Sequence, residues 1–578
     1  MNNREIADLF DRIADMLEVK GEIIHRVLAY RHAAESIREL PRDLRAIAAE
    51  NGLDDVPAIG KIIAEKIQEI LDTGTLQFYE KLSAEVPPGV VDILHVNGVG
   101  PKKARMFWQN ANITTLEALE AAAREGKLRE LPGMGAKSEA KILEGIESLK
   151  RRSADTRMPL GVALPVAEAL LERLLALPGA QKGVVAGSLR RARPTIGDVD
   201  LLVCAAEEYG APIISAFTKL DEVARVLGEG DTRGAVELHN GLQVDLRILP
   251  PERWGTALQY FTGSQAHNIK TRGIAQARGL QLNEWALTPT NSDPEILCAT
   301  EEEVYQRLGM SYIPPEIRED WGEIEAAQQG RIPELIELSD MRADLHMHTV
   351  WSDGRLTVRE MAEAARARGR EYIVITDHSQ GATIANGLSV ERLMQQAEEV
   401  RRVDADMRPF RVFHGTEMEI RADGTLDFPD EVLAQLDFVI ASLHVGLRQP
   451  RAQVTARLLN ALRNPHVDLI GHPRGQLIPD RDGADLDMDM VFEAAKANGT
   501  ALEINANPHR LDLEAGYARR AAELGIPISI NTDAHRAEEM DLMRFGILTA
   551  RRGWLPASAV INTWSLDQFL DWVTRRGK

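Results

Sequence analysis

Apolar residues recur every three to four positions through about the first 80 residues, which is the spacing of an amphipathic helix. One such stripe consists of Ile6, Leu9, Phe10, Ile13 and Leu17. Residues 158–250 instead alternate between helical runs and β-rich runs, as in a mixed sheet with packed helices. The pattern therefore predicts a helical N-terminal region followed by an α/β region.

A third pattern begins near residue 341, where short β-like apolar runs alternate with helical stretches such as 358–368 and 491–498. The apolar runs lead into histidines or carboxylates, and they lie at 372–376, 410–413, 438–442, 467–471 and 526–530. Repeated strand–helix units with polar residues at the strand ends are typical of an α/β barrel, whose active site gathers on that face. We therefore expect a C-terminal α/β barrel.

Three short segments between residues 56 and 138 repeat one arrangement, in which a glycine-containing turn joins two predicted helices. The turns contain Gly60, then Gly98 and Gly100, then Gly133 and Gly135, and the first turn has Ala58 at the position of its first glycine. Such a turn leaves backbone N–H groups free at a helix N-terminus, where the helix dipole favours a phosphate. One turn alone is more often an ordinary helix connection, but three predict helix-hairpin-helix clamps on a DNA backbone.

The length of 578 residues, at roughly 150 residues per domain, predicts about four domains. The expected parts are a helical domain at 1–82, a second hairpin subdomain at 83–157, a sheet domain at 158–250, a further subdomain at 251–318, a linker at 319–340 and the barrel at 341–578. Prolines and many carboxylates between residues 311 and 340 favour the linker. A shorter charged connector is expected at 150–155.

Charge and hydropathy restrict the partners. The net charge of −20 argues against a nonspecific basic coat for nucleic acid, so nucleic-acid binding must be local. The sequence has no run of about 18 apolar residues and no N-terminal signal sequence, which predicts a cytoplasmic protein without a membrane partner.

Its two cysteines, Cys204 and Cys298, lie in apolar surroundings and are expected to be buried thiols.

The segment from Gly187 to Asp200 carries the first candidate chemistry. It leads from a Gly-Ser turn and two arginines into a strand on which Asp198 and Asp200 share one face. Two such carboxylates repel each other unless a cation lies between them, and Mg²⁺ prefers oxygen ligands. Asp245 lies on a second alternating strand that could run alongside. A lone carboxylate pair is more often a solvated strand edge, but the turn and the third aspartate favour a metal-dependent nucleotidyl transfer centre.

Nine of the 14 histidines follow residue 340, and several of them stand at the ends of the β-like runs. His346 and His348 share one face of the first run, and Asp353 follows in a Ser-Asp-Gly turn. Imidazoles and carboxylates without cysteine suit Zn²⁺, Mn²⁺ or Fe²⁺, and so many of them imply more than one metal ion. A lone histidine would more often be structural, whereas this series predicts a multinuclear phosphoryl-transfer centre.

The motifs of the first half resemble those of the family X DNA polymerases. The hairpin segments are followed, in that family's order, by GSLRRARPTIGDVDLL, VDLRIL, YFTGSQAHN and Asn283-Glu284-Trp285, so the resemblance covers residues 1–318. It implies a nucleotidyltransferase palm at 158–250 and a nucleotide-selection subdomain at 251–318. In the palm, Asp198, Asp200 and Asp245 would bind two Mg²⁺ or Mn²⁺ ions, and Asp245 would help to activate the primer 3′-hydroxyl.

The same resemblance implies a nucleotide-binding site next to these aspartates. The matching residues are Gly187, Ser188 and Arg191 at the β- and γ-phosphates, Tyr260, Phe261 and Gly263 at the sugar, and Asn268 and Arg272 at the nascent base pair. From the pattern alone, core packing of the two aromatic residues and a solvated face for the helix remain open. Ala192 stands where the family often has glycine, and we expect no effect on the chemistry.

The N-terminal helices resemble the deoxyribose-phosphate lyase domain of this family. Lys66 falls at its Schiff-base lysine, and His25, Arg26 and Tyr30 match its 5′-phosphate pocket. A lysine nucleophile must be partly neutral, which requires desolvation or a cationic neighbour such as Lys61. A phosphate-site lysine of the family is replaced by Ile62, and a solvated structural role for Lys66 stays open.

Residues 341–575 resemble the polymerase and histidinol phosphatase (PHP) domain. The resemblance implies a distorted α/β barrel with a trinuclear site of Zn²⁺, Mn²⁺ or Fe. Its nine ligands would be His346, His348, Asp353, His378, Glu417, His444, His472, Asp533 and His535. Asp377, Glu419 and Arg474 are candidate supporting or phosphate-contact residues, and three further histidines (His414, His466 and His509) fall outside the pattern.

Together, the two resemblances imply a multidomain bacterial-type family X DNA polymerase with a C-terminal PHP domain. Its expected role is filling of short gaps in base excision repair, as a nucleoid-associated monomer that binds gapped or nicked DNA and dNTPs. The barrel would be a 3′–5′ exonuclease, with abasic-site endonuclease or 3′-phosphatase activity as further options. The alternatives are a nucleotidyltransferase for another substrate, and a barrel that hydrolyses pyrophosphate or serves as a structural metal domain.

Overall fold

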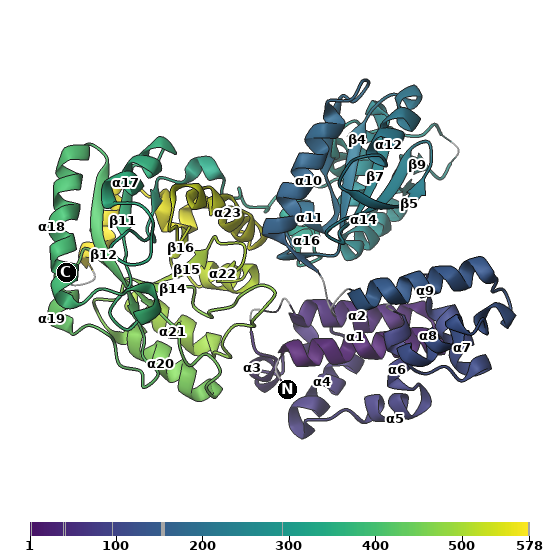
Figure 1. Ribbon diagram of the computed structural model, residues 1–578, viewed down its shortest axis with the longest axis horizontal. Helices are drawn as coiled ribbons and strands as arrows, with labels where there is room; N and C mark the ends of the chain where they lie inside the picture. The colour runs from purple at the N-terminus through teal and green to yellow at the C-terminus, as the bar shows by residue number, and fades with distance from the viewer. Residues whose placement is uncertain are drawn as a thin grey trace. The chain divides into compact units, whose positions relative to one another are not determined.

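The computed structural model describes residues 1, 3–38, 40, 42–94, 96, 98–151, 157–291 and 293–575. These fall into two compact units, Met1–Arg157 and Met158–Lys578 (Figure 1). The charged connector expected at 150–155 lies largely outside the described residues, as does Asn97 of the second hairpin. None of the described helices is long and apolar enough to span a membrane.

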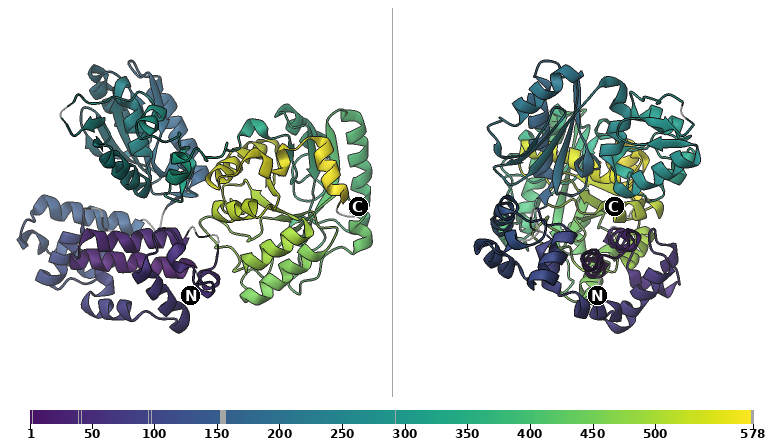
Figure 2. Two further views of the ribbon diagram at one scale, coloured as in Figure 1. Left: turned by 180° about the vertical axis from the view of Figure 1, so that it is seen from behind. Right: turned by 90° about the vertical axis from the view of Figure 1, so that its right-hand side faces the viewer.

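The first unit is helical, as the period of its apolar residues predicts. Its described α-helices are α1 Asn3–Lys20, α2 Ile24–Arg38, α3 Leu44–Ala49, α4 Lys61–Thr73, α5 Gln77–Glu85, α6 Pro88–Ile93, α7 Pro101–Ala111, α8 Leu116–Arg124 and α9 Ala136–Arg151. Helices α1 and α2 run side by side (Figure 2). Ile6, Phe10 and Ile13 of the predicted stripe are fully buried in the core of this unit.

The second unit begins with a five-stranded mixed sheet in the order β2-β4-β7-β6-β5. Its elements are α10 Leu160–Leu175, β2 Lys182–Val185, α11 Gly187–Arg190, β4 Asp198–Cys204, α12 Gly210–Phe217, β5 Val223–Glu229, β6 Arg233–Leu238 and β7 Gln243–Leu249; β1 Met158–Pro159 pairs separately with β3 Thr195–Ile196. Strands β4 and β7 are parallel, whereas the other pairs in the sheet are antiparallel. The expected Gly-Ser turn is the start of the short helix α11.

A smaller helical part follows the sheet. It consists of α13 Trp254–Thr262, α14 Gln265–Ala277, the hairpin β8 Leu280–Leu282 and β9 Leu287–Pro289, α15 Glu301–Arg307 and α16 Glu323–Gln328. Its core contains Tyr305, Ile313 and Cys298. Cys298 and Cys204 are buried free thiols, as predicted.

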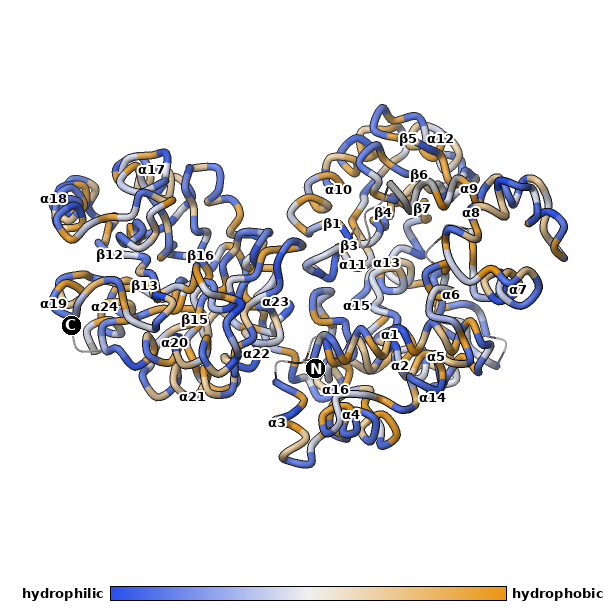
Figure 3. Tube along the Cα trace, turned by 60° about the horizontal axis from the view of Figure 1, so that its bottom comes forward, coloured by the Kyte–Doolittle hydropathy of each residue, from blue (hydrophilic) through white to orange (hydrophobic). Residues whose placement is uncertain are grey.

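The C-terminal strands form one parallel sheet in sequence order, which is the predicted barrel architecture. The strands are β10 Ala343–Asp344, β11 Tyr372–Ile375, β12 Arg411–Glu419, β13 Phe438–Ser442, β14 Leu469–Gly471, β15 Ala501–Asn505 and β16 Ile528–Asn531. A parallel bridge between Met347 and Ala534 joins the two edges, so the barrel is nearly closed. In Figure 3, the tube is hydrophilic along much of α18, which spans Val390–Met407.

Helices surround these strands. They are α17 Val358–Ala367, α18 Val390–Met407, α19 Asp430–Leu433, α20 Arg451–Arg463, α21 Met488–Asn498, α22 Ala515–Glu523, α23 Met543–Arg552 and α24 Leu566–Arg575. Strand β12 is longer than the predicted run and contains Glu417, because its second half pairs with β13.

The expectation of a polar linker at 319–340 is wrong. Ile324 and Ile336 are buried, and α16 lies within this stretch. Two of its carboxylates are also buried, because Glu319 pairs with Arg552 and Glu323 contacts His267, whereas Glu325, Glu334 and Glu337 are exposed. A charge can leave water when a partner of opposite charge compensates for its lost hydration.

Candidate active sites

The three palm aspartates lie on adjacent strands. Strands β4 and β7 are parallel with Asp200 directly opposite Asp245, and Asp198 lies on the same face of β4 as Asp200. Burial and the charges of Asp198 and Asp245 raise the pKa of Asp200 to about 7. Crowded carboxylates of this kind fit oxygen ligands for a divalent cation, which would relieve their repulsion.

Gly187 is in close contact with this cluster. Its φ of +60° is in the left-handed region, and a Cβ built on it would lie 2.3 Å from Asp200 Oδ2. Only glycine therefore fits between α11 and β4 without displacing the Asp200 carboxylate. Ser188 follows in the first turn of α11 and is partly exposed.

Arg191 links this turn to the end of α13. Its Nη1 donates to the carbonyl oxygen of Thr262 at 2.6 Å, and its Nε donates to Glu319 at 3.1 Å. Gly263 has φ +72°, and a Cβ there would lie 2.9 Å from Arg191 Nη1. The structure thus brings together Arg191 and the turn at Gly263, which are about 70 positions apart in the sequence.

The aromatic pair and α14 adjoin the same region. Tyr260 and Phe261 are half-buried with their rings edge to face, and the guanidinium of Arg247 lies 4.5 Å from the Phe261 ring. Asn268 Nδ2 donates to the carbonyl oxygen of Tyr260 at 2.7 Å, and Arg272 Nε donates to the carbonyl oxygen of Asn268. Asn268 is therefore fixed against the aromatic turn and is not on a freely solvated helix face.

All three hairpin turns lead directly into helices. Gly60, Gly100 and Gly135 precede α4, α7 and α9, and all five candidate glycines are exposed with open space at their Cβ positions. Gly98 and Gly133 have positive φ, and Ala58 adopts the same left-handed conformation in the first turn. The turns therefore present accessible backbone N–H groups at helix N-termini, as a phosphate site requires.

Phe78 connects the residues of the candidate lyase site, and the sequence reading did not include it. Lys66 Nζ lies 4.1 Å from its ring centroid, Arg26 lies 5.3 Å from it, and Tyr30 stacks on it. Burial lowers the pKa of Lys66, and among the charges Arg26 lowers it further. The cationic neighbour is thus Arg26 and not Lys61, which is exposed, as is His25.

In the barrel, the nine predicted ligands come together at the strand ends. Glu417 is central, since its carboxylate oxygens lie 2.8–3.7 Å from ring nitrogens of five histidines. The five are His346, His348, His378, His444 and His472. Histidines that are up to about 70 positions away from Glu417 in the sequence therefore lie in one cluster around its carboxylate.

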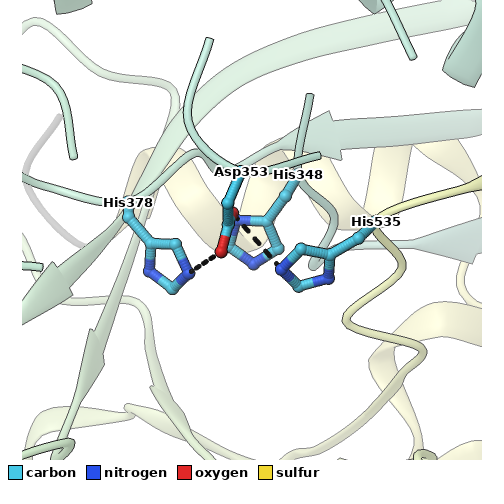
Figure 4. A group of neighbouring side chains, drawn as sticks. All are labelled: His348, Asp353, His378 and His535. Carbon is cyan, nitrogen blue, oxygen red and sulfur yellow. Dashed lines mark ion pairs between the residues drawn. The ribbon is translucent and has the colours of Figure 1, made fainter. Parts of the chain in front are cut away.

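Asp353 and Asp533 complete the cluster. Asp353 lies between His378 and His535, at 3.7 and 3.3 Å, with His348 beside them (Figure 4). Asp533 Oδ1 lies 3.0 Å from His348 Nε2. The described residues form three groups, and within each group the ligand atoms lie within 4.8 Å of one another; His348 and His378 each belong to two groups. The three candidate metal positions are therefore adjacent, as in a multinuclear site.

The donor atoms of this cluster fit metal ions. Buried atoms without a hydrogen-bond partner among the described residues include ring nitrogens of four of the histidines and Glu417 Oε2; the histidines are His346, His348, His378 and His472. Burial, followed by the charges of His378 and His535, lowers the pKa of His348 to about 3, so its imidazole is neutral and can donate a lone pair. Unpaired nitrogen and oxygen donors suit Zn²⁺, Mn²⁺ and Fe²⁺.

Supporting residues hold the ligands in place. Asp377 accepts hydrogen bonds from Thr349, Ser352 and Gln396, and Glu419 Oε2 lies 2.7 Å from His444 Nδ1. Arg474, expected near a phosphate, instead pairs with Glu514. His414 contacts Gln396, outside the cluster.

Two residues beside the cluster were missed by the sequence reading. Glu503 is fully buried on β15 and contacts both His346 and His472. A single carboxylate within a continuous apolar run was the signal that could have identified it. Arg510, on the loop after β15, has its Nε 3.9 Å from Asp533 Oδ2.

Comparisons with known protein families agree with these parts. Residues 1–76 match the family described as "Helix-hairpin-helix domain" and residues 90–148 the "SAM-like Helix-hairpin-helix tandem". Residues 257–319 match "DNA polymerase beta thumb", and residues 344–507 match "PHP domain".

Relatives support the same division. The chain is 32% identical over 244 residues to a probable phosphatase of Acetivibrio thermocellus, covering 40% of this chain and 95% of that protein. A probable phosphatase of Caldanaerobacter subterraneus subsp. tengcongensis is 29% identical over 246 residues, covering 41% and 92%. The "DNA polymerase/3'-5' exonuclease PolX" of Bacillus subtilis is 40% identical over 568 residues, which is 98% of each chain. The chain therefore belongs to the family X DNA polymerases that carry a C-terminal PHP domain.

Proposed function

We propose that this protein is a DNA-directed DNA polymerase that fills short gaps during base excision repair, and that its barrel is a metal-dependent 3′–5′ exonuclease. The observation that carries the first part is the pairing of Asp200 with Asp245, next to a turn in which Gly187 contacts Asp200. The name of the Bacillus subtilis relative, which aligns along the whole chain, states both activities.

In the polymerase site, Asp198, Asp200 and Asp245 would hold two Mg²⁺ or Mn²⁺ ions. When bound, these ions supply charge stabilisation to the displacement at the α-phosphate. Asp245 would accept a hydrogen bond from the primer 3′-hydroxyl. Ser188 and Arg191 would bind the β- and γ-phosphates of the incoming dNTP, for which the Arg191 guanidinium offers charge-assisted hydrogen bonds.

The nucleotide sugar would lie against Tyr260, Phe261 and Gly263, at the end of α13. Asn268 and Arg272 on α14 would face the nascent base pair. Because the Asn268 amide donates to the backbone carbonyl oxygen of Tyr260, a substitution of Asn268 is expected to move the aromatic turn.

DNA would be held outside the polymerase site by the hairpin turns at Gly60, Gly98–Gly100 and Gly133–Gly135, through backbone phosphates and without reading sequence. Arg26 and His25, which are exposed, would contact a 5′-phosphate at a gap. Lys66, whose pKa is lowered by burial, is the candidate Schiff-base nucleophile.

In the barrel, the nine ligands from His346 to His535 would hold three ions of Zn²⁺, Mn²⁺ or iron. When bound, these ions supply an activated water for hydrolysis of a phosphoester. Arg510 would contact the phosphate of the substrate, which its distance of 3.9 Å from Asp533 supports, whereas Arg474 pairs with Glu514. The exonuclease removes nucleotides from a 3′ end of the kind that the polymerase site extends.

The test uses one gapped substrate with wild-type protein, Asp198→Ala and His348→Ala. Primer extension should disappear in D198A and persist in H348A, whereas Mn²⁺-dependent release of 3′ nucleotides should show the reverse. Extension by D198A at the wild-type rate would refute the polymerase assignment. An unchanged rate of 3′ release by H348A would place the nuclease elsewhere.

A 3′-phosphatase is the second candidate for the barrel, because both shorter relatives are named probable phosphatases. A primer ending in a 3′-phosphate separates the two activities. Release of inorganic phosphate without shortening of the primer identifies the phosphatase.

A further inference from the structure

Helix α23 of the barrel part contacts the palm. Phe545 of this helix is 2% exposed and belongs to the same hydrophobic core as palm residues such as Val199 and Val244. The helix ends at Arg552, which is also almost fully buried. The C-terminal end of α23 therefore places a buried cation beside the nucleotidyl transfer part.

Glu319 joins this cation to the candidate phosphate-binding arginine. Its Oε1 accepts from Arg552 Nη1 at 2.6 Å and from Arg191 Nε at 3.1 Å, and Arg193 Nη1 lies 3.7 Å away. Arg552 Nη1 also donates to the carbonyl oxygen of Arg191 at 3.1 Å. The side chains of Glu319 and Arg552 are each 2% exposed, so water screens these interactions poorly.

Glu319 is ionised in this cluster. Burial alone would raise the pKa of Glu319, but Arg552, Arg191 and Arg193 together lower it well below the ordinary value, so Glu319 is an anion. Its carboxylate is thus shared by three arginines. Since Arg552 shares Glu319 with Arg191, it limits how strongly Glu319 retains the Arg191 guanidinium.

We infer that Arg552 and Glu319 are positioning residues for the polymerase site, so that the barrel part completes the binding site for the triphosphate of the dNTP. The inference rests on the proposed role of Arg191 in binding that triphosphate. Without Arg552, Glu319 would hold Arg191 more strongly. Stronger retention of Arg191 weakens triphosphate binding and does not alter the aspartates on β4 and β7.

Single-turnover gap filling over a range of dNTP concentrations tests the inference in the full-length protein. Arg552→Met should raise the dNTP Kd about 10-fold and change the maximal rate by less than about 2-fold, as expected when binding is lost and transition-state stabilisation is kept. Arg552→Lys should recover most of the affinity. Because Glu319 no longer retains Arg191 in the double variant Glu319→Gln/Arg552→Met, that variant should bind dNTP more tightly than R552M alone.

Arg551→Met is the matched control. Arg551 is the preceding residue of α23 and pairs with Glu316 at 2.7 Å, and its guanidinium also donates to the carbonyl oxygen of Ile336. R551M should bind dNTP like the wild type, and R552M should keep the wild-type rate of 3′-nucleotide release.

Two results would overturn the inference while the proposed function stands. The first is an unchanged dNTP Kd in R552M. The second is a dNTP Kd that increases equally in R551M and R552M. In both cases gap filling still depends on Asp198. A double variant whose dNTP Kd is no lower than that of R552M would also contradict the inference. The loss of dNTP affinity would then come from altered packing at residue 552, and not from retention of Arg191 by Glu319. Absence of Asp198-dependent gap filling in the wild type would refute the proposed function and, with it, this inference.

Discussion

Glu503 Oε1 lies 2.8 Å from Nδ1 of His346, and both side chains are fully buried. The other carboxylate oxygen of Glu503 accepts from the backbone N–H of His472 at 2.7 Å. One carboxylate on β15 therefore orients two of the nine candidate ligands, and leaves the Nε2 atom of His346 for a metal ion. A carboxylate behind a ligating histidine fixes the ring and increases its basicity.

Glu503→Gln is predicted to impair the barrel site and spare the polymerase site. The amide keeps the shape but removes the charge, so metal affinity and 3′-nuclease activity should fall about 10- to 100-fold. Metal content per chain and release of 3′ nucleotides measure this effect. Glu493→Gln, at an exposed position on α21, is the control. Normal metal content and nuclease activity in E503Q would show that Glu503 is only a packing residue.

Gly187→Ala is predicted to inactivate gap filling. Its Cβ would lie 2.3 Å from Asp200 Oδ2, so the carboxylate must move, and a shift of about 1 Å at a reacting centre can lower the rate about 100-fold. Gly241→Ala is a control for backbone strain, since Gly241 has φ +83° but open space around its Cβ position. Both variants should lose roughly 1–2 kcal/mol of stability, and only G187A should lose activity. Equal polymerase rates in the two variants would contradict the close approach of Gly187 to Asp200.

Ala58→Gly is predicted to stabilise the first unit. Ala58 has φ +62°, where a Cβ is unfavourable. Glycine should therefore raise the free energy of unfolding by roughly 0.5–1 kcal/mol, after its greater conformational freedom in the unfolded chain is deducted. Ala64→Gly, within α4 of the same hairpin, should instead lose about 1 kcal/mol. Chemical denaturation followed by circular dichroism measures both changes. A loss of stability in A58G would mean that residue 58 does not need the left-handed conformation.

Lys66 is predicted to form a borohydride-trappable adduct with a 5′-deoxyribose-phosphate end. Burial and Arg26 lower its pKa, so the amine becomes neutral, and trapping begins, at a lower pH than for an ordinary lysine. Phe78→Ala should move this onset to higher pH, because water then reaches the ammonium group. Lys66→Ala should abolish the adduct, and Lys61→Ala, at an exposed position of the same helix, should leave it. Trapping that survives in K66A would assign the adduct to another amine.

Much of the fold could be predicted because its signals are local. The three-to-four spacing of Ile6, Phe10 and Ile13 reflects one buried helix face, and the alternation at 243–249 became β7. Eight of the nine ligand-type residues of the barrel were identifiable because they follow a strand, and strand ends in a parallel barrel share one face, whereas Glu417 lies within β12. Their identity as ligands stays a prediction, whereas their convergence around Glu417 is observed.

Local patterns along the chain are therefore enough to predict which residue types stand at the ends of the elements. Which distant charges meet depends on how the chain folds. The segment at 319–340 has the composition of a solvated linker, yet Glu319 is buried because Arg191 and Arg552, more than 100 positions away on either side, both reach it. In the same way, Arg474 forms an ion pair with Glu514, and Arg510 lies 3.9 Å from Asp533. Burial of a charge depends on partners that only the folded chain brings close, and no local pattern records that pairing.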